Sequence, residues 1–282
     1  FQLVLSASLA CDWDTSSAGL TPRDLAMNVA LPELDGRLLS RAVGFKSAPR
    51  RHPLTHAMTT SYEAVPERAA FVAKLAAGWA RLRSLQAGDR RVALIMANYP
   101  NRDGRLANGV GLDTPESVFA AMRSLADAGY GVAGLPDDSA ALIAQMKEGP
   151  TNAGWQGRVS DVSLPLEIYR AQFASLPETV RDAVTQRWGA PADDPMCDGE
   201  RFHVPLRRYG NLIVGIQPAR GYNIDPKATY HSPDLVPPHN YFALYVWLRE
   251  VFGVHAVVHF GKHGNLELSL IHISEPTRPQ CI

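Results

Sequence analysis

The chain has 282 residues and 46% of them are hydrophobic, which suffices for the packed core of one or two domains. Its 28 basic and 28 acidic residues cancel, which excludes a global positive field that would attract nucleic acid or an anionic membrane. The three cysteines form no CxxC pair, and no apolar run approaches the ~18 residues that span a bilayer. We therefore expect a cytoplasmic protein without a disulfide scaffold, a thiolate zinc site or a membrane span.

Residues 1–60 show little regular periodicity and predict an irregular α/β segment. The start, FQLVLSASLAC, lacks an initiating Met and a basic region. We interpret it as a strand that continues from a missing upstream part, not as a signal peptide. Thr21 and Pro22 predict a helical turn, because Thr caps helices and Pro suits the first helical position.

The next part, 61–200, has the pattern of an α/β domain. Apolar residues at helical spacing predict a helix at 65–86, which Pro66 begins. The uninterrupted apolar run at 92–96 is typical of a buried parallel strand. Further helices are predicted at 115–128, 137–147 and 164–188, the last with a break at Pro177.

A second α/β region is predicted at 201–267. It contains a strand at 211–217 and another at 255–260. Between them lies a helix at 239–252, whose core-facing residues are predicted to be Phe242, Tyr245, Val246 and Leu248. Strands that alternate with helices predict an α/β fold with a mainly parallel sheet and flanking helices.

The last segment, 268–282, contains SLIHISEPTR, which resembles the translation of a sequencing adapter. We treat this segment as a non-native tail and exclude its His272 and Cys281 from any site. Together with the unusual start, this predicts that the chain is a fragment of a larger multidomain subunit.

Three predicted strands run into polar, glycine-rich loops, and open α/β sheets bind ligands at the carboxyl ends of their strands. The first two loops carry the polar residues Asn98, Asn101, Arg102, Asp103, Arg105, Gln217, Arg220, Tyr222, Asn223, Asp225, Lys227, Tyr230 and His231. Their arginines supply forked donors that can grip carboxylates. Both loops are also compatible with plain connections, because turns need Gly, Asn and Asp. No GxxxxGK[ST] motif occurs, so no phosphate loop is predicted.

The third loop begins in VVHFGKHGNLE, where His259, His263 and Glu267 follow one another at four-residue intervals. Imidazoles and a carboxylate can bind a divalent transition metal or carry protons. Gly261 and Gly264 disfavour an uninterrupted helix, but a strand followed by a turn can still bring the three side chains together. On spacing alone, an ordinary strand and turn, with one His packed and one solvated, remains an alternative.

Longer segments resemble one family. VGIQPARGYNIDPKATYHSPDLVPPHNYFALYVWLREVFGVHAVVHFGKHGNLE resembles the signature region of the CobN/magnesium chelatase H family, to which the large subunit of cobaltochelatase belongs. RVALIMANYPNRDGRLANGVGLDTPES and LAMNVALPELDGRLLSRAVGFK are similar to upstream blocks, so the resemblance spans nearly all of 1–267. NYPNRDGRLANGVGLDTP, RGYNIDPKATYHSPDLVPPH and KHGNLE favour the cobalt branch. The family motif continues past Glu267 with Trp, where this chain has Leu268.

The resemblance implies an ATP-dependent ligase that inserts Co²⁺ into hydrogenobyrinic acid a,c-diamide in cobalamin biosynthesis. In this family the large subunit binds the tetrapyrrole and the metal, and AAA+ ATPase partner subunits consume ATP. Residues 201–267 would then begin the metal and tetrapyrrole site, and the fragment alone would be inactive. The alternatives are a magnesium chelatase H subunit acting on protoporphyrin IX, a non-catalytic tetrapyrrole-binding module and a purely structural α/β fragment.

The resemblance also suggests roles for individual residues. We expect Glu267 to accept a proton or guide the metal, with His259 and His263 as metal ligands or proton relays. Positively charged side chains are expected to grip the carboxylates of the substrate. The predicted substrate-binding residues are Asn98, Arg102, Arg105, Gln217, Arg220, Tyr222 and Lys227.

Overall fold

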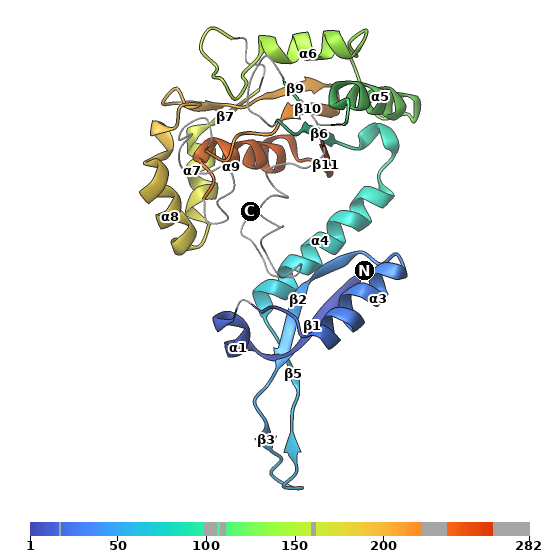
Figure 1. The fold of residues 1–282 in the computed structure, drawn as a ribbon, viewed down its shortest axis with the longest axis vertical. Helices are drawn as coiled ribbons and strands as arrows, with labels where there is room; N and C mark the ends of the chain where they lie inside the picture. The colour runs from blue at the N-terminus through green and yellow to red at the C-terminus, as the bar shows by residue number, and fades with distance from the viewer. Residues whose placement is uncertain (17, 99–105, 108–110, 159–161, 222–235, 262–282) are drawn as a thin grey trace. The chain divides into compact units, whose positions relative to one another are not determined.

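The computed structural model describes residues 1–16, 18–98, 106–107, 111–158, 162–221 and 236–261 (Figure 1). The chain forms two compact units, with the boundary between Arg83 and Ser84. The segmentation expected at 60, 200 and 267 stays a prediction. Within the described ranges, no helix is long and apolar enough to cross a membrane.

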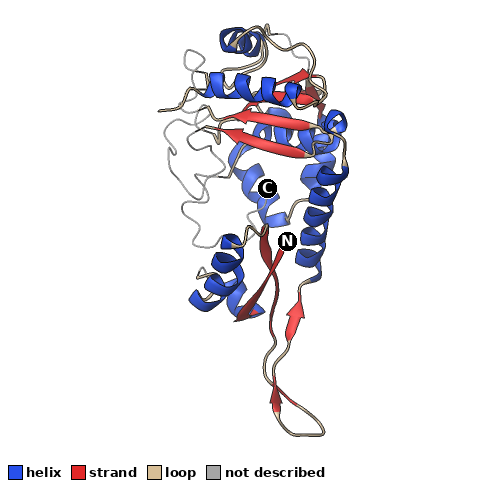
Figure 2. Cartoon of the chain, turned by 90° about the vertical axis from the view of Figure 1, so that its right-hand side faces the viewer, coloured by secondary structure: helices blue, strands red, loops and turns tan. Residues whose placement is uncertain are grey.

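The N-terminal unit is built on a three-stranded sheet in the order β1–β2–β5. Strands β1 (Gln2–Leu9) and β2 (Leu39–Lys46) are parallel, and β2 pairs antiparallel with β5 (Tyr62–Ala64). A hairpin of β3 (Arg50–Arg51) and β4 (Met58–Thr59) extends from this sheet (Figure 2). The helical segments of the N-terminal unit are α1 (Ala10–Thr15), α2 (Pro22–Leu25), η1 (Ala26–Ala30), α3 (Leu31–Leu34) and α4 (Pro66–Ser84).

Local signals explain how these short elements begin and pack. The Thr21 side chain accepts a hydrogen bond from the Asp24 backbone N–H, with Pro at the first helical position, so the predicted turn is confirmed. The small core includes Trp13 and Phe45, whose ring centroids lie 5.0 Å apart. The guanidinium of Arg68 covers both rings and donates a hydrogen bond to a β2 carbonyl, which keeps this buried cation paired.

The C-terminal unit contains a four-stranded sheet in the order β11–β6–β10–β9. Strand β6 (Val92–Met96) is parallel to both β10 (Leu212–Ile216) and β11 (Ala256–Phe260), and β9 (Leu206–Tyr209) is antiparallel to β10. The three predicted strands and the mainly parallel sheet are therefore confirmed. Strand β9 was not predicted from the sequence. Neither was the antiparallel pair of β7 (Ser163–Pro165) and β8 (Arg201–His203).

Helices cover both faces of this sheet, as Figure 1 shows. One face packs against α5 (Thr114–Asp127) and α6 (Ser139–Glu148) through Leu94, Met96 and their neighbours. The other face packs against α7 (Leu166–Ala174) and α9 (His239–Val246) through Ala93 and Ile95. Because successive strand residues point to opposite faces, the run VALIM serves two cores, which explains why it is apolar throughout.

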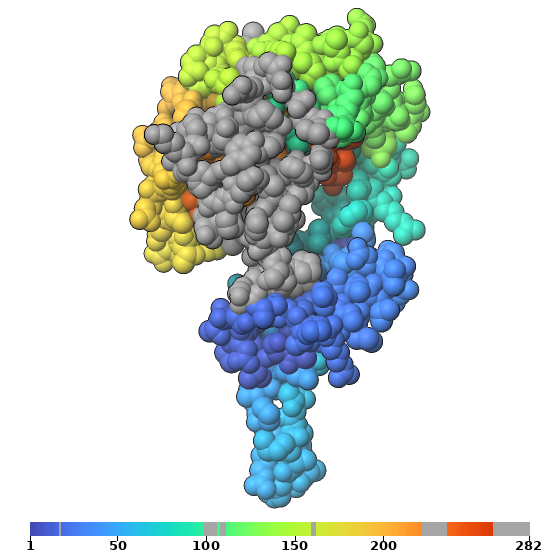
Figure 3. Space-filling model, in the orientation of Figure 1, coloured from blue at the N-terminus to red at the C-terminus, as the bar shows by residue number. Residues whose placement is uncertain are grey.

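The remaining helices follow the predicted breaks. The helix expected at 164–188 begins after β7 and divides into α7 and α8 (Glu178–Trp188) around Pro177. Helix α9 continues as the π-helical turn η5 (Trp247–Phe252) and ends at Gly253, whose φ of 64° is left-handed and suits glycine. Two short 3-10 turns are η2 (Ala87–Asp89) and η4 (Pro191–Asp193). In the space-filling view, α8 forms the yellow flank of this unit (Figure 3).

Candidate functional site

The carboxyl ends of three parallel strands meet at one edge of the sheet. Met96 at the end of β6 lies in register with Ile216 of β10 on one side and Phe260 of β11 on the other. The ladder continues beyond them, because Ala97 donates to the Phe260 carbonyl at 2.7 Å and Gln217 donates to the Met96 carbonyl at 2.9 Å. The three loops that the sequence places at strand ends therefore start side by side, where α/β sheets bind their ligands.

Asn98 is the first polar side chain beyond β6. Its side chain is only 2% exposed, and its Oδ1 accepts a hydrogen bond from the backbone N–H of Ala107 at 3.2 Å. Its Nδ2 is buried and has no hydrogen-bond partner among the residues that the structure describes. A buried donor left unpaired costs about 1–3 kcal/mol, so a ligand acceptor at this position would be well matched.

Gln217, which follows β10, is fully buried between two tyrosines of α9. Its Nε2 donates to the Tyr245 hydroxyl at 3.3 Å and more weakly to the Tyr241 hydroxyl at 3.5 Å. The Gln217 carbonyl accepts a hydrogen bond from Asn152 Nδ2 at 3.0 Å. These contacts hold the start of the second loop against the helix.

The tyrosines give this edge an aromatic wall. Tyr241 and Tyr245 are one helical turn apart, and their ring centroids are 5.4 Å apart. Burial raises the pKa of Tyr241 well above its usual range, and the charge of Tyr245 and a hydrogen bond between the two side chains add to the rise. The Tyr241 hydroxyl therefore stays protonated near neutral pH. Burial also lowers the pKa of the nearby Arg220, against the influence of Tyr241, so this guanidinium is a partly desolvated cation.

His259 lies at the end of β11, half-buried, beside the same wall. Its ring centroid is 6.3 Å from that of Tyr245, with an angle of 37° between the ring planes. The backbone two residues later passes so close to β6 that a side chain at Gly261 would collide with Ala97. Glycine is therefore required where the third loop leaves the sheet.

The structure thus brings Asn98, Gln217, Arg220 and His259 to one edge of the sheet. Six further predicted site residues lie outside the described residues: Arg102, Arg105, Tyr222, Lys227, His263 and Glu267. Within the described part of the chain, no group of three His, Cys, Asp or Glu side chains could hold a metal ion. The cluster of His259, His263 and Glu267 stays a prediction.

Sequence reasoning missed the two tyrosine contacts at this edge. Tyr245 was expected only as a core residue of its helix, and Tyr241 was not singled out. Their four-residue spacing on a predicted helix could have indicated a shared face. The partner that faces them, Gln217, is distant in the sequence, so the pattern alone could not supply the contact.

A second histidine–tyrosine cluster lies at the start of α9 and anchors that helix. His239 is fully buried, with its Nε2–H donating to the Gly189 carbonyl at 3.1 Å and its Nδ1 accepting from the Tyr169 hydroxyl at 2.8 Å. Burial lowers the pKa of His239, so the ring is neutral. The carboxylate of Asp194 accepts hydrogen bonds from the backbone and side chain of Asn240, which secures the first turn.

Comparison with known proteins decides the family. A family model described as CobN/Magnesium Chelatase matches residues 1–269. The chain belongs to the CobN/magnesium chelatase family. The resemblance seen in the signature segments is therefore confirmed, and so is the α/β architecture that it implies.

Relatives of known function place the chain within this family. It is 50% identical over 284 residues to the aerobic cobaltochelatase subunit CobN of Sinorhizobium sp, covering 100% of this chain and 22% of that protein. It is 30% identical to the chloroplastic magnesium-chelatase subunit ChlH of Oryza sativa subsp. indica, covering 91% of this chain and 18% of that protein. A solved structure of the catalytic subunit of cobaltochelatase from Mycobacterium tuberculosis matches with a TM-score of 0.79 at 39% identity, covering 94% of this chain and 22% of that one. The chain spans about a fifth of the length of these relatives.

Proposed function

We propose that the chain is part of the tetrapyrrole-binding large subunit of an ATP-dependent cobaltochelatase, which inserts Co²⁺ into hydrogenobyrinic acid a,c-diamide in cobalamin biosynthesis. The cobalt branch is supported by 50% identity to CobN, against 30% to the magnesium-chelatase subunit ChlH. The reaction forms nitrogen–metal bonds. In this proposal, AAA+ ATPase partner subunits hydrolyse the ATP.

The observation that carries this proposal is the convergence of three strand ends around a buried, unpaired amide donor. The Asn98 Nδ2 has no partner within the described residues, and it lies at the edge where His259 and Arg220 also lie. A tetrapyrrole with acidic and amide side chains presents both acceptors and carboxylates to such donors. Gln217 is held by two tyrosines, so in this proposal it lines the site and orients the second loop.

The loops that follow these strands supply the rest of the proposed site. Arg102 and Arg105 come after β6, and Tyr222 and Lys227 come after β10. Charged donors on loops from adjacent strands can grip several carboxylates on the rim of one macrocycle. This arrangement would hold the ring over the edge of the sheet.

Metal insertion sets two chemical demands at the centre of the ring. The Co²⁺ substrate must lose its bound waters, and two pyrrole N–H protons must leave. We propose that His259 and His263 replace waters on the incoming metal and that Glu267 accepts a proton or guides the metal. Imidazole is a suitable ligand for cobalt, and a carboxylate supplies a negative charge and a base.

The test uses the full-length subunit with its ATPase partners and measures cobalt insertion by absorbance. Glu267→Gln removes the proposed base without changing the size of the side chain. We expect insertion to fall at least about 100-fold while tetrapyrrole binding, measured by fluorescence quenching, is retained. Glu250→Gln, at an exposed position in η5, is the matched control and should insert cobalt normally.

Each result has a distinct meaning. Near-normal insertion by Glu267→Gln would show that this carboxylate is not the base or the metal guide. A wild-type subunit that does not bind the tetrapyrrole would overturn the proposed function itself. Insertion of Mg²⁺ into protoporphyrin IX in place of Co²⁺ insertion would assign the chain to the magnesium branch.

A further inference from the structure

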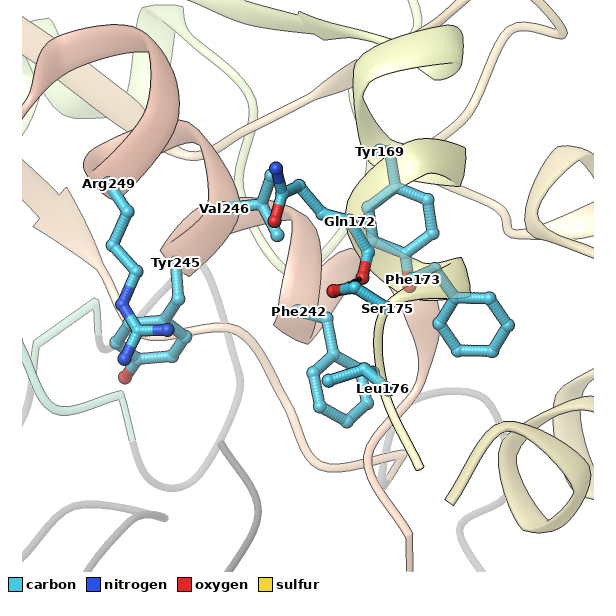
Figure 4. A pocket seen from close by; sticks show the side chains of 9 residues that line it. All are labelled: Tyr169, Gln172, Phe173, Ser175, Leu176, Phe242, Tyr245, Val246 and Arg249. Carbon is cyan, nitrogen blue, oxygen red and sulfur yellow. Dashed lines mark hydrogen bonds between the residues drawn. The ribbon is translucent and has the colours of Figure 1, made fainter. Parts of the chain in front are cut away.

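A pocket lies between α7 on one side and α9 with its continuation η5 on the other. Its volume is about 130 Å³, and Figure 4 shows the side chains that line it. Phe173, Leu176, Phe242 and Val246 give it apolar walls. Arg249 and Tyr245 lie at one end of the pocket, and Tyr169 lies at the other (Figure 4). The pocket therefore combines an apolar interior with a cationic end.

The size of the pocket limits its occupant. A cavity of ~150 Å³ admits a molecule the size of benzene. The pocket is therefore too small for a macrocycle and large enough for one short acid or amide side chain. Its apolar walls suit the methylene groups of such a side chain, and its polar end suits the terminal carboxylate.

The polar groups of the pocket differ in how far they are already engaged. Arg249 is exposed and has no ion-pair partner among the residues that the structure describes. The side-chain amide of Gln172 likewise makes no hydrogen bond within the described ranges, whereas the Ser175 hydroxyl donates to the Gln172 carbonyl at 2.7 Å. The hydroxyl of Tyr169 is engaged with His239 at 2.8 Å. A carboxylate would therefore be drawn to the Arg249 end.

Tyr245 links this pocket to the candidate site. Its ring lines the pocket, its hydroxyl accepts a hydrogen bond from Gln217, and its centroid is 6.3 Å from that of His259. The candidate site and the pocket share one helix. Tyr241 and Tyr245 contact Gln217 at the strand ends, while Phe242, Val246 and Arg249, together with Tyr245, line the pocket against α7. A group in the pocket is thus one aromatic ring away from the proposed metal ligand.

We propose that this pocket is a subsite for one carboxylate-bearing side chain on the rim of the tetrapyrrole, with Arg249 as the residue that pairs with the carboxylate. The inference rests on the proposed function, because it takes the macrocycle to lie over the strand ends. It adds a specificity determinant outside the three loops. Anchoring one rim group here fixes the rotation of the ring above His259.

The experiment measures the affinity of the full-length subunit for hydrogenobyrinic acid a,c-diamide by fluorescence quenching. Arg249→Ala should weaken binding about tenfold, because it removes one charge-assisted contact. Arg249→Lys should recover part of that loss. Arg123→Ala, which removes an exposed arginine from α5 on the other face of the sheet, is the matched control and should bind like the wild type.

A second probe separates charge from shape. With the methyl ester of the same tetrapyrrole, Arg249→Ala and the wild type should bind alike, because the ester carries no carboxylate. Val246→Trp fills the pocket and should weaken the binding of both the acid and the ester, since it blocks entry of the side chain. Retained circular dichroism and an unchanged melting temperature show that each variant is folded.

The outcomes distinguish this subsite from the proposed function. If Arg249→Ala and Val246→Trp both bind the acid within twofold of the wild type, the subsite is overturned, although wild-type binding and the Glu267→Gln result still support the proposed function. If Arg249→Ala weakens the ester as much as the acid, the carboxylate pairing is overturned. If the wild-type subunit binds no tetrapyrrole, both proposals fall together.

Discussion

Two histidine–tyrosine clusters lie beside α9, one of His239 with Tyr169 and one of His259 with Tyr245. They are made of similar residues and differ in how completely the protein buries the histidine. At the start of the helix, His239 is fully buried and both ring nitrogens are hydrogen-bonded. Beyond the end of the helix, His259 is half-buried beside Tyr245. On the neighbouring strand end, the Asn98 amide has a donor without a partner in the described part of the chain. The comparison shows that packing, and not residue type, separates a structural histidine from a candidate ligand.

The difference follows from the position of each histidine relative to the core and to the edge of the sheet. His239 lies within the hydrophobic core of the α7 and α9 face, where an unpaired nitrogen would be costly, so Tyr169 and Gly189 engage both nitrogens. His259 lies at the carboxyl edge, where the ladder ends and loops begin. Among the described residues at this edge, Asn98 keeps an unpaired Nδ2, which a ligand or water can satisfy.

The largest predicted effect is a loss of stability when the buried cluster of His239 and Tyr169 is broken. His239→Ala leaves a cavity and strands the Tyr169 hydroxyl and the Gly189 carbonyl, so we expect the free energy of unfolding to fall by about 3 kcal/mol. Urea denaturation of the chain, followed by far-ultraviolet circular dichroism, measures this loss. A change below about 1 kcal/mol would mean that the cluster does not anchor α9.

Substitution of His259, in the cluster with Tyr245, should affect activity much more than stability. His259→Ala removes a half-buried ring, so the free energy of unfolding should change by less than about 1 kcal/mol in the same urea experiment. In the full-length subunit with its ATPase partners, we expect cobalt insertion to fall about 100-fold. A large loss of stability with normal insertion would reverse the comparison and make His259 a packing residue.

The dependence of stability on pH gives a smaller, directional test. Because burial lowers the pKa of His239 in the folded chain, the unfolded chain takes up a proton first, at the ordinary histidine pKa of about 6.5. Stability contributed by the neutral ring is therefore complete above that pH. It is lost as the pH falls from there toward the folded pKa.

Urea midpoints at pH 7.5 and 5.5 measure this loss. His239→Gln, which keeps hydrogen-bonding groups but cannot titrate, should lose less stability between the two pH values than the wild type does. Equal losses in the two proteins would show that His239 does not contribute to the pH dependence. His259→Ala is the comparison variant, because the ring that it removes is not enclosed in the core. It should lose about as much stability between the two pH values as the wild type does.

Much of the fold could be predicted because it is encoded in short stretches. The run VALIM has the continuous apolar character of a strand buried on both faces, and the structure places alternate residues of β6 in two cores. The turn at Thr21 and Pro22 and the break at Pro177 follow from caps and proline geometry. The position of three polar loops at strand ends was also predicted, because it depends only on element order and a parallel sheet.

The contacts of the site could be predicted only in part. Asn98 was expected from its place after an apolar strand, and His259 from its place at the end of one. The clamp of Tyr241 and Tyr245 on Gln217 was not, and neither was the pocket that Tyr245 shares with α7. The roles of His263 and Glu267 stay predictions, since they lie outside the described residues.

By itself, the sequence determined the local elements, the α/β class and the family resemblance, because periodicity, capping residues and long motifs are properties of neighbouring residues. Only the tertiary structure decided that β6 lies between β10 and β11, and that α9 turns Tyr241 and Tyr245 to the strand ends and Phe242 and Val246 to α7. Those choices depend on contacts between segments far apart in the chain. Their free energy comes from burying several surfaces together, which no local pattern records.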